Sequence, residues 1–289
     1  MERLKVVFYL LKDAAKAFGE DKVSRLAAAL AYYTLFSVAP LLVIAIGIVG
    51  LVIGGNNAQD QVVLQLEATA GPQVAEALTE MIGSVSRPSA GVAATVFGVL
   101  ILMWGASQVL AQLKDAFNTI WKITPAPDAG IWFTIRQRII SLGMVLTVGF
   151  LLLVSLVLSA GVASVNGLLV NTVPAFTMAL PVLDWITSLL IMTPLFALIF
   201  RVLPDTPLTW GDVMVGGGVT ALLFLLGKYL IGFYLANSGV TSAYGAAASL
   251  IILLLWVYYS AQLLFFGAEI TKIYTYRFGS RRAEKTKAT

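Results

Sequence analysis

Residues 246–271 read AAASLIILLLWVYYSAQLLFFGAEIT, an apolar stretch in which the first charged side chain is Glu269. A helix rises 1.5 Å per residue, so about 20 residues cross the roughly 30 Å of hydrocarbon in a bilayer. The stretch is therefore long and apolar enough to span a membrane. Of the 289 residues in the chain, 59% are hydrophobic and only 12% are charged. A soluble domain carries about 25% charged residues, so this composition indicates a helical membrane protein.

Similar apolar runs predict an all-α bundle of six transmembrane helices, which forms one membrane domain over residues 25–271. The predicted spans are 25–54, 91–112, 139–165, 181–202, 213–236 and 246–271. Residues 1–24 place apolar side chains on one helical face and lysines on another, which is typical of an amphipathic helix on the membrane surface. Residues 272–289 form a basic tail. We therefore expect a surface helix, a membrane domain and a tail.

The basic residues predict the orientation of the bundle. Outside the spans, 17 of 18 Lys and Arg residues fall in segments on one side. Cytoplasmic loops are enriched in Lys and Arg, so this side is predicted to be cytoplasmic and to hold both termini. The opposite segment, 55–90, is mainly acidic and contains two short amphipathic stretches, 58–70 and 72–85, separated by Gly71-Pro72. We expect these stretches to cap the outer mouth of the bundle.

The absence of two residue types limits the possible chemistry. The chain contains no cysteine and no histidine, which excludes disulfides, thiolate chemistry and the commonest catalytic base and metal ligand. The acids near the cytoplasmic side occur in separate segments without metal-ligand spacing: Asp115, Asp128, Asp205, Asp212 and Glu269. We expect no catalytic residue, metal or cofactor. Positive-inside bias also explains the formal charge of +4 better than a nucleic-acid partner does.

Lys228 is a charge inside predicted span five. A lysine there costs about 3 kcal/mol on insertion scales, so it should face protein or water. We place Lys228 roughly 12 Å below the outer boundary, within side-chain reach of Asp184 in span four. In one interpretation Lys228 snorkels outward and tethers helices. In the other it contacts an anion or a lipid headgroup, and the adjacent Tyr229 helps to surround an amphiphile.

Four polar residues lie near the inner ends of spans two and six. Gln262 and Glu269 are seven residues apart and share a helix face, and Gln108 and Asp115 repeat this spacing. We expect them to form a polar inner gate. The alternative is that Glu269 is an interfacial carboxylate that snorkels to water.

Two further features predict close packing. Pro40 removes a backbone hydrogen bond and should kink span one, where Ser37 can hydrogen-bond to the backbone. This region is either a tightly packed, kinked helix or a discontinuous helix that lines a substrate path. Gly216-Gly217-Gly218, near the start of span five, indicates close backbone contact or a hinge.

Several short stretches resemble the YihY/BrkB family of bacterial inner-membrane proteins. They are AAALAYY at 27–33, LPD at 203–205, Lys228, LWVYYS at 255–260 and FGAE at 266–269. The family was once labelled ribonuclease BN, a label now regarded as a misassignment, and we expect no ribonuclease activity. The resemblance implies a multi-pass protein of the bacterial inner membrane.

The resemblance also implies that the chain transports or flips a lipid or another amphiphilic envelope precursor, since this has been proposed for other members. Membrane lipids and an anionic amphiphile are then the expected partners. The main alternative is a non-transporting scaffold that binds envelope-biogenesis proteins. An intramembrane enzyme is a third possibility. A polar cavity reaching Lys228 favours transport, whereas a solid core with a large exposed apolar groove favours the scaffold.

Overall fold

The computed structural model describes residues 2–35, 37, 58–85, 108–123, 180–244 and 247–282, and no strand occurs among them. The helices are α1 (Glu2–Glu20), α3 (Ala58–Ala70), α4 (Pro72–Val85), α7 (Leu180–Val202), α8 (Trp210–Asn237), α9 (Val240–Tyr244) and α10 (Ala248–Arg277). Residues 23–35 and 108–120 are also helical. The all-α prediction is therefore confirmed for this part of the chain.

Three of the described helices, α7, α8 and α10, are long and apolar enough to cross a membrane. They coincide with predicted spans four, five and six. Span three, most of spans one and two, and Pro40 lie outside the described residues. Within the described part of the chain, three helices are thus candidate membrane spans by length and composition.

Helix α10 is longer than predicted and ends at Arg277 instead of residue 271. Residues 272–277 therefore belong to this helix and not to a tail. The extension keeps one face in contact with protein, because Thr275 is fully buried and Tyr276 packs against the core. The prediction ended the span at residue 271 because the apolar run ends there.

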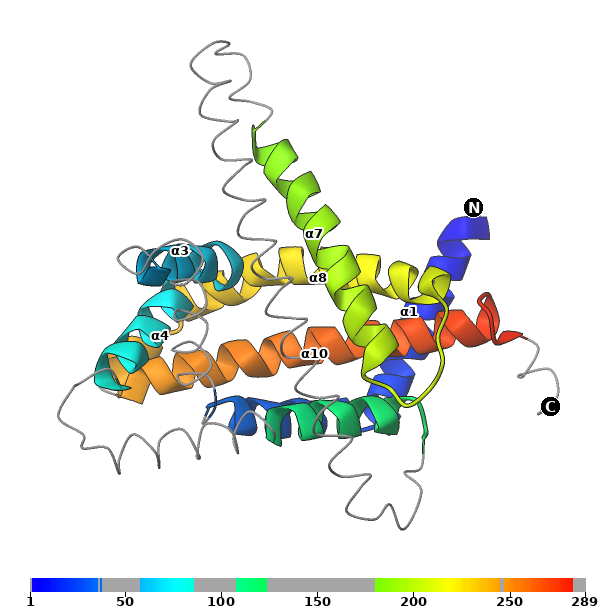
Figure 1. The fold of residues 1–289 in the computed structure, drawn as a ribbon, viewed down its shortest axis with the longest axis horizontal. Helices are drawn as coiled ribbons and strands as arrows, with labels where there is room; N and C mark the ends of the chain where they lie inside the picture. Colours follow the sequence, from blue (N-terminus) through cyan, green and yellow to red (C-terminus); the bar gives the residue numbers. More distant parts are fainter. Residues whose placement is uncertain are drawn as a thin grey trace.

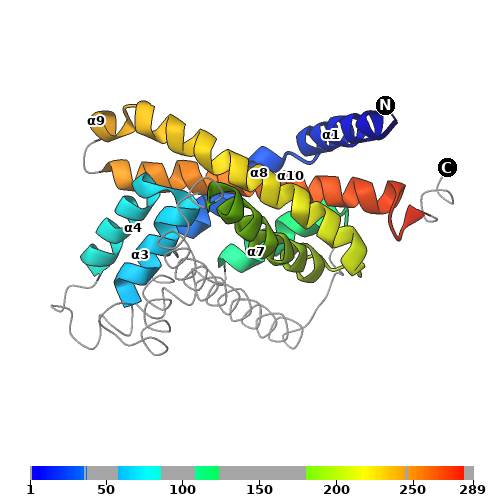
Figure 2. The same ribbon diagram turned by 90° about the horizontal axis from the view of Figure 1, so that it is seen from above.

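The helices form a bundle around α8 and α10, which run antiparallel and are joined through α9 (Figure 1). Helix α7 packs across α8 in both views (Figures 1 and 2). The helical residues 23–35 and 108–120 contribute to the same core as α7, α8 and α10. At its centre the ring of Phe117 lies 5.8 Å from that of Phe200 and 5.9 Å from that of Phe265. These three buried aromatic rings link three separate segments.

Consecutive glycines bring α8 close to two different helices. A side chain on Gly216 would overlap Thr271 of α10, and one on Gly217 would overlap the backbone of α7 at Thr193 and Ala197. The close contact predicted for this stretch is therefore confirmed. Small residues allow such approach where hydrophobic burial does not drive helix association, as in a membrane.

Helices α3 and α4 have the bounds predicted for the two outer stretches. Gly71 between them has a φ of +93°, which a glycine adopts without steric cost, and Pro72 then starts α4. Val74 and Leu78 are buried in a core cluster that also contains residues of α8 and α10. The pair lies at the end of the bundle at which α9 connects α8 to α10 (Figure 2).

Helix α1 packs against α10 through only part of its surface. Ala14 is fully buried, and the ring of Phe18 lies 5.9 Å from that of Phe266. Phe8 and Leu11 are exposed. The predicted N-terminal helix is confirmed, and its exposed apolar side chains are those expected of a helix in contact with a membrane surface.

Candidate functional site

Segments with basic residues meet at one end of the bundle, opposite α3 and α4 (Figure 1). We call this the basic end. It comprises the turn after α1, residues 114–122, the α7–α8 connection and the C-terminal part of α10. Ion pairs join these segments: Arg277 Nη1 lies 3.0 Å from Asp13 Oδ2, and Lys114 Nζ lies 2.9 Å from Asp205 Oδ1. Segments predicted to share the cytoplasmic side are therefore neighbours in space.

Asp205, from the Leu-Pro-Asp stretch, holds the α7–α8 connection against residues 108–120. Asn118 Nδ2 donates a hydrogen bond to Asp205 Oδ2 at 3.0 Å. In return the Asp205 backbone N–H donates to Asn118 Oδ1 at 3.1 Å. This reciprocal pair, together with Lys114, gives Asp205 a structural role at the basic end.

A group of four charges, three of them largely buried, lies within the basic end. We call Asp21, Lys122, Glu269 and Lys272 the ion-pair cluster. Lys272 Nζ lies 2.7 Å from Glu269 Oε2 and 3.3 Å from Asp21 Oδ2, and it donates to the Ile120 carbonyl at 2.7 Å. Lys122 donates a hydrogen bond to Asp21 Oδ1. The cluster therefore joins α10, the turn after α1 and the end of the 108–120 helix.

Local backbone conformation positions Lys122. Its φ of 55° lies in the left-handed region, directly after the 108–120 helix. The Lys122 N–H donates to the Thr119 carbonyl at 3.1 Å, and the Ile123 N–H donates to the Asn118 carbonyl at 2.8 Å. This pair of bonds is a Schellman motif, which ends the helix and turns the chain. The turn places the Lys122 ammonium against Asp21.

The carboxyl group of Asp21 is held in its ionised form. Its side chain is only 1% exposed, and burial alone would raise its pKa. Three other effects outweigh burial: a hydrogen bond with Lys122, an interaction with the adjacent Glu269 carboxyl group and the positive charge of Lys272. The pKa of Asp21 is therefore lowered from its ordinary value of 3.8. An anion at this position is thus part of the folded structure at neutral pH.

The residues predicted to form the inner gate differ in burial. Glu269 is fully buried in the ion-pair cluster, whereas Gln108 and Gln262 are half-buried and Asp115 is exposed. The partners of Glu269 were not singled out from the sequence. The Glu269-x2-Lys272 spacing was a local signal for one of them, since residues three apart on a helix are neighbours. Asp21 had no such signal.

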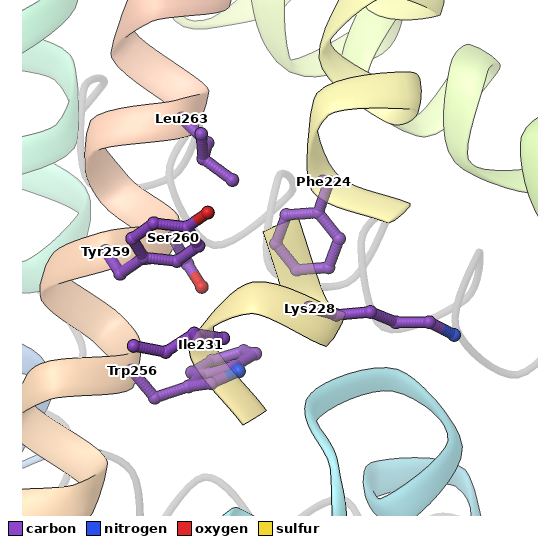
Figure 3. A pocket seen from close by; sticks show the side chains of 7 residues that line it. All are labelled: Phe224, Lys228, Ile231, Trp256, Tyr259, Ser260 and Leu263. Carbon is purple, nitrogen blue, oxygen red and sulfur yellow. The ribbon is translucent and has the colours of Figure 1, made fainter. Parts of the chain in front are cut away.

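Lys228 lines a narrow crevice between α8 and α10 (Figure 3). The lining side chains are Phe224, Lys228, Ile231, Trp256, Tyr259, Ser260 and Leu263. The crevice itself has no space that admits a water molecule. Figure 3 shows the half-buried Lys228 side chain extending away from the crevice. Its Nζ lies 5.2 Å from the centroid of the Tyr229 ring.

Tyr229 forms an aromatic pair with α7. The rings of Tyr229 and Trp185 are nearly parallel, with centroids 6.0 Å apart, and Tyr229 is 54% exposed. Asp184, the predicted partner of Lys228, precedes Trp185 on α7, but its side chain lies outside the described residues. Tyr229 was predicted from the sequence as a site residue, but Trp185 was not, although its aromatic side chain at the predicted membrane boundary was a signal for it.

Ser37 is fully buried at the end of the described part of span one. Its hydroxyl lies 3.3 Å from the Tyr33 carbonyl and 3.2 Å from the Thr34 carbonyl, and it donates to these acceptors. The predicted hydrogen bonding of Ser37 to the backbone is therefore confirmed. The kink expected at Pro40 stays a prediction, because Pro40 lies outside the described residues.

Comparison with known proteins gives consistent matches. The family model described as "Virulence factor BrkB" matches residues 14–289. A UPF0761 membrane protein of Acinetobacter baylyi is 26% identical over 92% of this chain and 62% of its own length. One from Psychromonas ingrahamii is 26% identical over 94% of this chain and 89% of its own length.

A third relative, a UPF0761 membrane protein of Pseudomonas aeruginosa, is 29% identical over 89% of this chain and 60% of its own length. The chain thus spans less than two thirds of the Acinetobacter and Pseudomonas relatives. No solved structure matches the chain.

Proposed function

The chain belongs to the virulence factor BrkB family, and from this premise we propose that it transports or flips an anionic lipid or another anionic envelope precursor in the bacterial inner membrane. Its relatives are membrane proteins, and three of its described helices have the length and apolarity of membrane spans. The observation that carries the proposal is the position of Lys228.

Lys228 places a cation in the second half of α8, among residues that otherwise suit hydrocarbon. An ammonium group that is buried in protein or exposed to lipid has an unfavourable free energy. A lysine at such a position is therefore expected to bind a group of opposite charge. Nearby Tyr229, Phe233 and Tyr234 are all more than half exposed. An ammonium beside exposed aromatic and apolar side chains suits a ligand with an anionic headgroup and apolar chains.

The proposal includes six spans with both termini in the cytoplasm. Two features support this topology. Basic residues from four segments gather at one end of the bundle, and α3 and α4, with Asp60, Glu67, Glu76 and Glu80, lie at the other. A cytoplasmic basic end agrees with the positive-inside rule. Lys228 then lies in the outer half of the bilayer.

We also propose that the chain is not an enzyme and that its partners are lipids. Movement of an amphiphile is then either passive or coupled to an ion gradient or a protein partner. In the described conformation the Lys228 crevice is too narrow for water, so the ammonium reaches its ligand from the lipid-facing side or after the helices separate.

The test uses purified full-length protein in vesicles that contain fluorescent phosphatidylglycerol or fluorescent phosphatidylethanolamine. We expect the protein to accelerate the equilibration of phosphatidylglycerol between the leaflets. Lys228→Met should slow this by about tenfold, which corresponds to ~1.4 kcal/mol. Lys228→Arg should keep part of the rate, since it keeps the charge but changes its geometry. Lys16→Met, which removes an exposed lysine of α1, is the matched control.

Three outcomes separate the interpretations of Lys228. Loss of transport with unchanged thermal stability supports a ligand-binding lysine. Loss of stability in Lys228→Met, with recovery of both stability and transport in Lys228→Met combined with Asp184→Asn, shows that the pair is only structural. Equal rates for wild type and protein-free vesicles overturn the proposed function.

A further inference from the structure

Two buried carboxyl groups share one ammonium in the ion-pair cluster. The side chains of Asp21, Glu269 and Lys272 are 1%, 0% and 13% exposed, respectively. Lys272 Nζ contacts both carboxyl groups and also donates to the Ile120 carbonyl. Two hydrogens of the ammonium are engaged by Asp21 and the Ile120 carbonyl, so Lys272 cannot compensate both carboxylates fully.

Glu269 is the less compensated of the two acids. Asp21 also receives a hydrogen bond from Lys122, whose side chain is 66% exposed. Among the described residues, Lys272 is the cation that pairs with Glu269, and neither Glu269 oxygen makes a hydrogen bond of normal geometry. A buried carboxylate in this position is costly, and the adjacent negative charge of Asp21 adds to the cost. Binding a proton removes both penalties.

We propose that Glu269 is a proton-binding site, and that proton uptake there releases Lys272 to Asp21 and the Ile120 carbonyl. The Glu269 carboxylate takes one proton from water and becomes a neutral carboxyl group, and no other reactant is needed. Within the described part of the chain, the charged groups that act on Glu269 are Lys272 on α10 and Asp21 after α1, and Lys122 after the 108–120 helix contacts Asp21 in turn.

The location of the site links protonation to structure. Lys272 is the point at which α10 is tied to the turn after α1, and α1 also contacts α10 through the Phe18–Phe266 rings and the Asp13–Arg277 ion pair. A change of partner at Lys272 therefore alters the attachment of α1. This inference deepens the proposed function and rests on it in one respect, since the proton would then be the coupling ion for transport.

Infrared difference spectroscopy tests proton binding without any transport assay. Full-length protein in nanodiscs of phosphatidylethanolamine and phosphatidylglycerol is titrated from neutral to acidic pH. We expect a carbonyl band of a protonated carboxyl group that shifts on incorporation of isotopically labelled glutamate. Glu269→Gln should remove this band, whereas Glu20→Gln, which changes an exposed glutamate of α1, should leave it. Glu269→Asp should move it, which keeps the test valid if Glu269→Gln does not fold.

A second measurement tests how the attachment of α1 to α10 responds to protonation. The chain has no cysteine, so a single Ala14→Cys substitution reports the accessibility of the α1–α10 contact by its rate of maleimide labelling. Because Lys272 given over to Asp21 ties α1 more firmly to α10, the rate, corrected for thiol ionisation with the exposed Ala15→Cys on the same helix, should fall several-fold on acidification. In the Glu269→Gln background it should not depend on pH.

The two measurements fail in different ways. Absence of a Glu269-dependent band at every pH overturns the proton site, and a band with a constant labelling rate in Ala14→Cys overturns the link to α1. If the protein transports lipid but shows no Glu269-dependent band, the proposed function is supported and the proton is not its coupling ion. If the protein shows the band but transports no lipid, the proton site is supported and the proposed function is contradicted.

Discussion

Gly216 of α8 lies directly against Thr271 of α10, so that any side chain on this glycine would overlap the threonine. The relationship is reciprocal, because Gly267 of α10 lies in the same way against Thr220 of α8. Each threonine hydroxyl donates to a carbonyl of its own helix at 2.7 Å, Thr220 to Gly216 and Thr271 to Gly267. The two antiparallel helices thus interlock through matching Gly-x3-Thr sequences in which both hydroxyl groups are hydrogen-bonded.

Replacement of Gly216 by alanine should destabilise the protein. The added methyl group meets the Thr271 side chain at a packed position, and such overpacking costs about 1–3 kcal/mol. Gly232→Ala is the matched control on the same helix, since no atom lies within 4 Å of the new methyl group. Thermal unfolding in detergent should show a lower midpoint for Gly216→Ala alone. Partial recovery by Thr271→Gly is expected, and equal midpoints for the two alanine variants would contradict the interlocked packing.

Asp21→Asn should weaken the basic end at neutral pH. The lowered pKa of Asp21 means that its ionised form stabilises the fold at pH values above its ordinary pKa of 3.8. This stabilisation is lost as the pH falls below 3.8 and through the folded-state pKa. Removing one member of a buried ion-pair network costs about 2 kcal/mol.

The measurement is the unfolding midpoint of wild type and Asp21→Asn as a function of pH. The gap between them should be widest near neutrality and should close at strongly acidic pH. Glu20→Gln, at a side chain that is 63% exposed, should follow wild type throughout. A gap that stays constant with pH would mean that Asp21 contributes by packing and not by its charge.

Substitutions of Lys122 separate its backbone role from its charge. Lys122→Gly removes the ammonium but suits the left-handed conformation, whereas Lys122→Ala loses the ammonium and also disfavours that conformation by about 1 kcal/mol. We therefore expect Lys122→Ala to be less stable than Lys122→Gly in thermal unfolding. The opposite order would show that the φ of 55° is not required for the turn.

Reporter fusions test the proposed topology. A reporter joined after residue 289 should be active in the cytoplasm, and one inserted between α3 and α4 at Gly71 should be active on the outer side. The turn at Gly71 connects two short helices at the end opposite the basic end, so an insertion there avoids the spans. Two reporters on the same side would refute the proposed arrangement, in which the C-terminus lies inside and α3 and α4 lie outside.

The bounds of several helices followed from local properties of the chain. Apolar runs predicted α7, α8 and most of α10, and Gly71-Pro72 predicted the boundary between α3 and α4. These features depend on hydropathy and backbone preference, which act over a few residues. The end of α10 was placed too early, because the buried face that continues to Thr275 becomes evident only when its neighbours are known.

For the charged residues as well, some features followed from the local sequence and others only from the tertiary structure. Hydropathy was enough to identify Lys228 and Glu269 as charges within apolar helices, because the cost of such a charge depends on the surrounding sequence. Tertiary structure alone determined that Lys272 reaches Asp21, which is 251 residues away in the chain, and that Glu269 shares this lysine. An ion pair requires two groups within about 4 Å, and that proximity arises from helix packing, which no local pattern of residues specifies.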